Sequence, residues 1–183
     1  MERRQFSYFI DLFIDNNRPP TYYRTMYKVN ADTRNEYLNE AVNSGRDLKS
    51  IDTFIQKIAP TLQPWFYDVG PKDPGMTFKM VAYGKFTYTP AKSPDAVIDW
   101  PVIGIALQKN YISVYISITK DDKPLVDYYD QLGYTRRGNN NFSFETFGQL
   151  DKSAFEQMIK EIARIFNEDP ENPVRFKQGD YKG

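Results

Sequence analysis

The chain has 183 residues, of which 40% are hydrophobic and 26% charged, a composition typical of a globular domain with one sizeable core. Its 24 basic and 24 acidic side chains cancel, so no basic excess exists to neutralise phosphates, and we expect no nucleic-acid partner. The absence of Cys and His excludes disulfides, thiolate nucleophiles and imidazole bases, and removes the usual zinc ligands.

Residues 1–46 form an N-terminal extension that we expect to be helical. Apolar residues over 6–14 fit a helix face and a strand equally well, and we favour a helix. Asp11 interrupts that apolar stretch and Asp15 directly follows it, so we expect neither a signal peptide nor a membrane span, and a cytoplasmic protein. A second helix is predicted over 33–43, with Asp32 as its N-cap.

An α+β domain is predicted over residues 47–168, beginning with an amphipathic helix. Asp47 can cap its first turn, and apolar residues then recur at helical spacing as far as Leu62. Pro60 and Pro64 limit how far this helix continues.

Four short strands are predicted next, at residues 76–82, 85–89, 100–108 and 111–119. In the last of them, Ile and Val at even positions alternate with Tyr and Ser at odd positions. This alternation predicts a sheet with one face on the core and the other toward solvent.

The rest of the domain adds a short helix over 122–131, a fifth strand over 142–147 and a long helix over 151–167 capped by Asp151. Residues 169–183 have little periodicity, and we expect a loose tail. The order of elements predicts an α+β fold, in which helices pack on one face of a mostly antiparallel five-stranded sheet.

Three segments carry a family resemblance: IAPTLQP at 58–64, MTFKMVAYGK at 76–85 and PVIGIALQKNYISVYI at 101–116. Together with a late helix over 155–166, they resemble the YdhG-like family, a mostly bacterial domain of unknown function. Family members often have a Trp-Gly-Met-Pro-like stretch where this chain has MVAYG at 80–84. The resemblance implies a frataxin-like fold and, because some members have been interpreted as iron chaperones, intracellular iron handling. It supplies no catalytic residues.

Metal binding in this chain would depend on oxygen ligands, which suit hard cations such as ferric iron. The candidate metal ligands are carboxylates near the sheet and after the last helix: Asp121, Asp122, Glu168, Asp169 and Glu171. Their spacing matches no known metal motif, and an N-cap role for Asp122 and a solvated helix end for the others explain them more simply. We therefore expect no cofactor, with iron as the alternative.

The second face of the predicted sheet is the candidate ligand-binding surface. Lys79 and Tyr83 share one side of a strand, and Tyr111 and Tyr115 share one side of another. If those two sides coincide, the four residues line a shallow groove for a small molecule or a peptide. Otherwise the tyrosines are packing residues beneath the N-terminal extension. Arg136, in an Arg-Arg pair beside an Asn-rich turn, is an anion-binding candidate or part of a solvated turn.

Since the sequence contains no recognisable set of catalytic residues, we expect an intracellular, non-enzymatic binding or accessory protein whose partner is a small molecule or a protein. Two alternatives stay open: a frataxin-like iron-binding protein, and an enzyme that acts on a small polar substrate without His or Cys.

Overall fold

The structure of the chain, a computed structural model, describes residues 29–43, 47–68, 79–88 and 97–169. The helix predicted over residues 6–14, the tail beyond Asp169 and the metal candidate Glu171 lie outside these ranges. None of the helices within them is long and apolar enough to cross a membrane.

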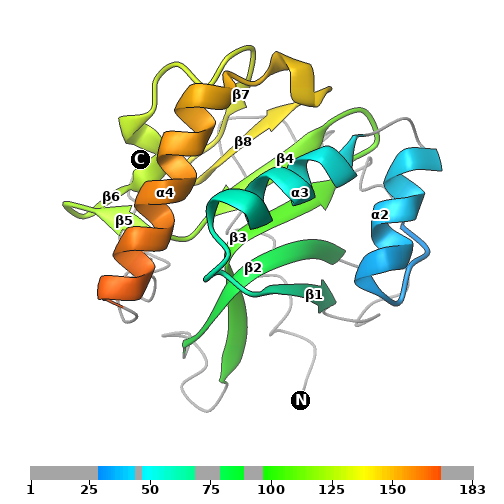
Figure 1. The fold of residues 1–183 in the computed structure, drawn as a ribbon, viewed down its shortest axis with the longest axis horizontal. Helices are drawn as coiled ribbons and strands as arrows, with labels where there is room; N and C mark the ends of the chain where they lie inside the picture. The colour runs from blue at the N-terminus through cyan, green and yellow to red at the C-terminus, as the bar shows by residue number, and fades with distance from the viewer. Residues whose placement is uncertain (1–28, 44–46, 69–78, 89–96, 170–183) are drawn as a thin grey trace, which may run out of the picture.

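A six-stranded sheet with the strand order β1-β2-β3-β4-β8-β7 lies at the centre of the fold (Figure 1). All of its neighbouring strands are antiparallel. The strands are β1 (Pro64–Asp68), β2 (Lys79–Tyr88), β3 (Ile98–Leu107), β4 (Ile112–Ile116), β7 (Arg136–Arg137) and β8 (Asn141–Phe144). The sequence predicted five strands, and the count differs because β1 and β7 were not predicted and two predicted strands form β2.

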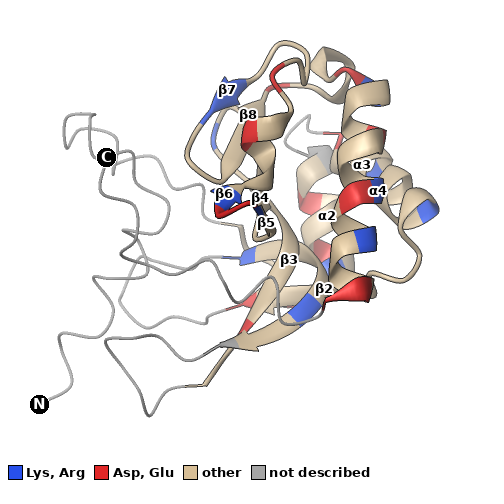
Figure 2. Cartoon of the chain, turned by 90° about the vertical axis from the view of Figure 1, so that its left-hand side faces the viewer, with Lys and Arg blue, Asp and Glu red and all other residues tan. Residues whose placement is uncertain are grey.

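The described helices lie on one side of this sheet, as the side view shows (Figure 2). They are α2 (Arg34–Asn43), α3 (Leu48–Ile58) and α4 (Lys152–Glu168). The predicted α+β architecture is therefore confirmed. The caps of α3 and α4 are confirmed too, since Asp47 accepts from the Ser50 amide and Asp151 from the Ala154 amide.

The predicted helix over 33–43 is present, but its cap differs from the prediction. The Thr33 hydroxyl accepts from the Glu36 amide (3.2 Å), and the Glu36 carboxylate accepts from the Thr33 amide (3.2 Å). This is a reciprocal capping box, which the sequence Thr-x-x-Glu favours. Asp32 therefore precedes the cap, and its side chain contacts Lys79 instead.

The predicted strands 76–82 and 85–89 are one strand because Gly84 bends the chain without ending the pairing. The β2–β3 register is the same on both sides of Gly84, whose φ is +63°. A Cβ at this position would lie 3.0 Å from Val102 Cγ2. Glycine thus permits a left-handed residue and a close strand contact at the same point.

The helix predicted over 122–131 is wrong. Asp121 and Asp122, with φ of 48° and 59°, form the turn of a small hairpin between β5 (Thr119–Lys120) and β6 (Lys123–Pro124). Both residues are left-handed, as the tight type I′ hairpin turn requires. A single 3₁₀ turn, η2 (Leu125–Tyr128), follows, so Asp122 caps no helix.

Side chains of the sheet alternate between two buried faces. In β4, Ile112, Val114 and Ile116 belong to the main core beneath the helices, whereas Tyr115 belongs to a smaller cluster on the second face. The predicted alternation is therefore confirmed, but the second face is buried where the sequence predicted exposure. Residues of α2 share the main core, so the N-terminal extension is not a separate unit at this helix.

The Tyr37 hydroxyl from α2 completes the ladder between β2 and β3. Their pairing ends at Val81↔Ile105, and the same register places Lys79 opposite Leu107, two positions beyond this last pair. There the Tyr37 hydroxyl accepts from the Leu107 amide (2.7 Å) and donates to the Lys79 carbonyl (2.9 Å). Burial raises the pKa of Tyr37, although the Leu107 hydrogen bond lowers it. The phenol therefore stays neutral and able to donate.

Tyr37→Phe is expected to lower the free energy of unfolding by about 2 kcal/mol, because a buried amide and a carbonyl each lose their partner. Urea denaturation measures the loss. Tyr134→Phe is the matched control, since Tyr134 is 82% exposed, and its effect should stay within about 0.5 kcal/mol. Equal effects in the two variants would contradict the bridging role of Tyr37.

Candidate functional site

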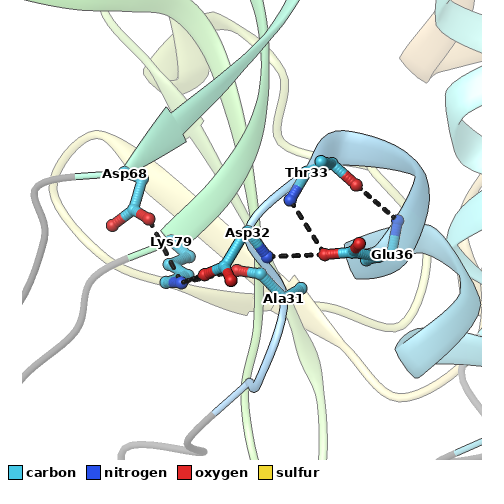
Figure 3. Close-up of polar contacts among 6 residues, drawn as sticks. All are labelled: Ala31, Asp32, Thr33, Glu36, Asp68 and Lys79. Carbon is cyan, nitrogen blue, oxygen red and sulfur yellow. Dashed lines mark hydrogen bonds and ion pairs between the residues drawn. The ribbon is translucent and has the colours of Figure 1, made fainter.

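The amine of Lys79, the first predicted ligand-binding residue, is enclosed by acceptors (Figure 3). Its Nζ lies 3.1 Å from Asp68 Oδ2 and 3.3 Å from Asp32 Oδ1, and it donates to the Ala31 carbonyl. The side chain is only 9% exposed. Three acceptors match the three N–H donors of an ammonium group. Lys79 therefore connects the segment before α2 to the sheet through hydrogen bonds and ion pairs.

The charge of Lys79 is kept by these neighbours. Burial alone would lower its pKa, but the hydrogen bonds and the charges of Asp68 and Asp32 outweigh burial and raise it. A lysine held as a cation between two carboxylates is unsuited to act as a base or as a nucleophile.

Tyr83, the second predicted residue, faces the helices in a buried polar network around Asp52 of α3. The Asp52 carboxylate accepts from the Tyr83 hydroxyl (2.5 Å), from Gln56 Nε2 (2.9 Å) and from the Arg34 guanidinium. Burial and the Asp52 charge raise the pKa of Tyr83 well above its usual value. Sequence reasoning missed Asp52, although its position between Leu48 and Ile55 on the apolar stripe is the signal of a buried carboxylate.

Tyr115 lies on the opposite face of the sheet, where Tyr67 and Trp100 belong to the same cluster. It is 6% exposed, and burial raises its pKa. Tyr111 is half-buried at the start of the β4 region. The structure therefore does not bring Lys79 and Tyr83 together with the two other tyrosines. The groove that the sequence suggested is not formed, because Tyr83 and Tyr115 project to opposite faces.

Arg136 lies on β7, the strand at one edge of the sheet (Figure 2). Its side chain is exposed and has no ion-pair partner among the described residues. The neighbouring Arg137 lies 3.8 Å from Asp130, whose side chain is 90% exposed. Tyr134, two residues before Arg136, is 82% exposed. We call Tyr134, Arg136 and Arg137 the β7 edge surface.

The metal candidates do not assemble in the described residues. Asp121 and Asp122 lie at the tip of the β5–β6 hairpin, Glu168 pairs with Arg164, and Asp169 follows the end of α4. Within the part of the chain that the structure describes, no three His, Cys, Asp or Glu side chains are grouped to hold a metal ion.

A further polar cluster that the sequence did not predict joins the β5–β6 hairpin to α4. The Glu161 carboxylate accepts from Lys120 Nζ (2.8 Å) and from the Tyr129 hydroxyl (2.6 Å). Partial burial alone would raise the pKa of Glu161, but the bonds from Lys120 and Tyr129 outweigh burial and lower it. These residues are 41 and 32 positions from Glu161, so no local pattern reveals the cluster.

Glu161→Gln is expected to destabilise the protein by about 1 kcal/mol at pH 7, because hydrogen bonds to a charged carboxylate become neutral ones. The folded pKa of Glu161 lies below its usual 4.5, so the stabilisation exists above that pH and disappears as the pH falls through the folded pKa. Thermal unfolding of both proteins from pH 7 to pH 3 should show the difference shrinking below about pH 4.5. The control Glu156→Gln alters a surface pair with Lys160 and should change stability little at any pH.

Comparison of the chain with protein-family models, with curated proteins and with solved structures finds no match.

Proposed function

We propose that this protein is an intracellular, non-enzymatic binding protein of the YdhG-like type, and that its partner binds at the β7 edge surface. The observation that carries the proposal is the 82% exposure of Tyr134 beside an arginine without a partner in the described residues. Tyr and Arg are the residue types that protein interfaces favour and that dominate their binding energy.

The polar clusters elsewhere in the described residues support a binding role over a catalytic one. Lys79, Asp52 and Glu161 each sit in a set of hydrogen bonds that joins separate elements of the fold. Because these groups stabilise the fold through hydrogen bonds between elements, a reaction that moved their protons would break those hydrogen bonds.

The backbone around Tyr134 supports a prepared surface. The Tyr134 amide donates to the Gln149 carbonyl (2.8 Å), and the Thr135 amide donates to the Gly133 carbonyl (3.0 Å). Tyr134 therefore presents its ring from a backbone that is fixed at both sides, which reduces the entropy lost when a partner binds.

The test is to purify the partner that stays bound to the wild-type protein, and to measure its affinity for the wild-type protein and for each variant by calorimetric titration. Tyr134→Ser and Arg136→Ser should each weaken binding by about tenfold or more. Val97→Ser is the matched control, because Val97 is a 74% exposed apolar residue away from β7, and it should leave the affinity unchanged. Equal affinity in all three variants would remove the β7 edge surface from the proposal.

Iron binding through surface carboxylates is the competing function that the resemblance implies. A calorimetric titration with ferrous and ferric iron separates the two. Saturable binding tighter than about millimolar would favour iron handling, whereas its absence leaves the binding-protein proposal in place.

A further inference from the structure

We infer that the β7 edge surface binds an acidic, extended segment of a partner protein, which joins the sheet as an additional strand. This inference rests on the proposed function and specifies the chemistry of the partner.

The main chain of β7 offers hydrogen-bonding groups at the open edge. Arg136 pairs with Ser143 and Arg137 with Phe142, and the Gly138 amide donates to the Asn141 carbonyl (2.9 Å). Hydrogen-bonded and non-hydrogen-bonded pairs alternate along an antiparallel ladder, so Arg136 is bonded to β8. The amide and carbonyl of Arg137 therefore point away from β8. Since β7 is the last strand in the order, no described strand pairs with them.

The charge of this edge selects an acidic partner. Between residues 131 and 144 the only charged side chains are Arg136 and Arg137. Arg137 has one acidic neighbour, Asp130, at 3.8 Å, and Arg136 has none among the described residues. A planar guanidinium matches a carboxylate with two parallel hydrogen bonds, so an acidic side chain next to the added strand would pair with Arg136.

The opposite edge of the sheet is a poorer acceptor for the same partner. Strand β1 begins with Pro64, which has no amide hydrogen, and ends with the carboxylate of Asp68. A second copy of this chain is also disfavoured at β7, because pairing two such edges would place arginines against arginines. The two basic residues therefore protect the edge from self-association while they attract an acidic strand.

The test uses a fluorescein-labelled peptide of about nine residues with alternating Glu and Val, a length typical of a strand. Anisotropy should show saturable binding to the full chain, weakened about tenfold or more by Arg136→Glu and by replacing each Glu of the peptide with Lys. The same acidic peptide with alternate backbone nitrogens methylated on one edge should also bind about tenfold or more weakly, because it cannot pair with the Arg137 main chain. Nitrogen-15 spectra should place the largest shift at the Arg137 amide.

Equal binding of the methylated peptide would overturn strand addition, and equal binding by the Arg136→Glu variant would overturn the charge selection. If the wild-type chain dimerises and Arg136→Glu alters that dimerisation, the β7 edge binds a second copy of the chain instead of an acidic partner. If the acidic peptide does not bind while Tyr134→Ser still weakens binding of the purified partner, the inference of an acidic added strand is wrong and the proposed function stands. If neither variant affects that partner, the proposed function falls as well. Arg136 is exposed, so its variants are expected to fold, and circular dichroism checks this.

Discussion

Asp52→Ala is expected to lower the free energy of unfolding by about 3 kcal/mol or more. The substitution removes the shared acceptor of Arg34, Gln56 and Tyr83. Tyr83 is fully buried, so its hydroxyl has no water to replace the carboxylate. Arg34 is already imperfectly satisfied, since its Nε is buried without a hydrogen-bond partner.

Urea denaturation measures this loss, and Asp99→Ala is the matched control. Asp99 also pairs with a cation, Lys85, at 3.0 Å, but its side chain is 49% exposed. An exposed pair contributes little, so the control should change stability by less than about 1 kcal/mol. Similar losses of unfolding free energy in the two variants would show that burial of the Asp52 network does not increase the cost of removing its carboxylate.

A triple variant separates two free energies: the stability lost when Arg34 and Tyr83 are left without their acceptor, and the net stability that the complete network contributes. Replacing Arg34 by Met, Asp52 by Leu and Tyr83 by Phe removes every charged partner at once. Apolar replacement of a complete buried ion pair is often neutral or stabilising. The triple variant should therefore be more stable than Asp52→Ala alone. If it is less stable, the network itself contributes net stability and the large single loss has a different cause.

Local patterns predicted the helices and strands that have strong periodicity. The apolar stripes of α3 and α4, their Asp caps and the alternation in β4 were all visible in the sequence and are confirmed. These features depend on residues within a few positions of one another, and their spacing is fixed by the helix and strand repeats.

The candidate groove could not be predicted because it required the relation between two strands. The repeat of two places residues of one strand on alternate faces, but it does not relate the face of Tyr83 to that of Tyr115. That relation depends on the register of β2 with β3 and of β3 with β4. In the same way, the pairing of Lys79 with Asp32 depends on a contact across 47 residues.

The wrong helix over 122–131 has a different cause. Pro124 and the preceding aspartates suit the first turn of a helix, and they suit a tight hairpin turn equally. Tertiary structure decides between them, since the Leu125 amide bonds to the Ile118 carbonyl (2.9 Å) across the hairpin. The exposure of Arg136, by contrast, needed only local information, because two adjacent arginines beside an Asn-rich turn are typical of a solvated turn. Its place on the edge strand β7 depends on the pairing with β8, which the sequence did not predict.

Gly133→Ala is expected to lower the free energy of unfolding by about 3 kcal/mol or more, through strain and backbone displacement together. Gly133 has a φ of +90°, and a Cβ there would lie 2.2 Å from the Gln149 carbonyl oxygen and 2.6 Å from the Asp151 amide nitrogen. Both atoms belong to the backbone that leads into α4, so neither can turn aside as a flexible side chain would. Relieving the clash would lengthen the bonds from Tyr134 to Gln149 and from Asp151 to Leu132.

Gly148→Ala, fifteen residues further along the same region, is the matched control for this substitution. Its Cβ would lie 3.9 Å from its nearest neighbour, Thr146 Oγ1, which is an ordinary contact. Alanine also restricts the unfolded chain more than glycine does, so this variant should be unchanged or more stable by about 0.5 kcal/mol. Urea denaturation of the two proteins should therefore give changes of different size, and of opposite sign where the control gains stability. Because Gly133 also fixes the backbone before Tyr134, its variant should bind the acidic peptide less well than the Gly148 variant. A Gly133→Ala protein as stable as the control would show that the contact between this turn and the start of α4 is loose.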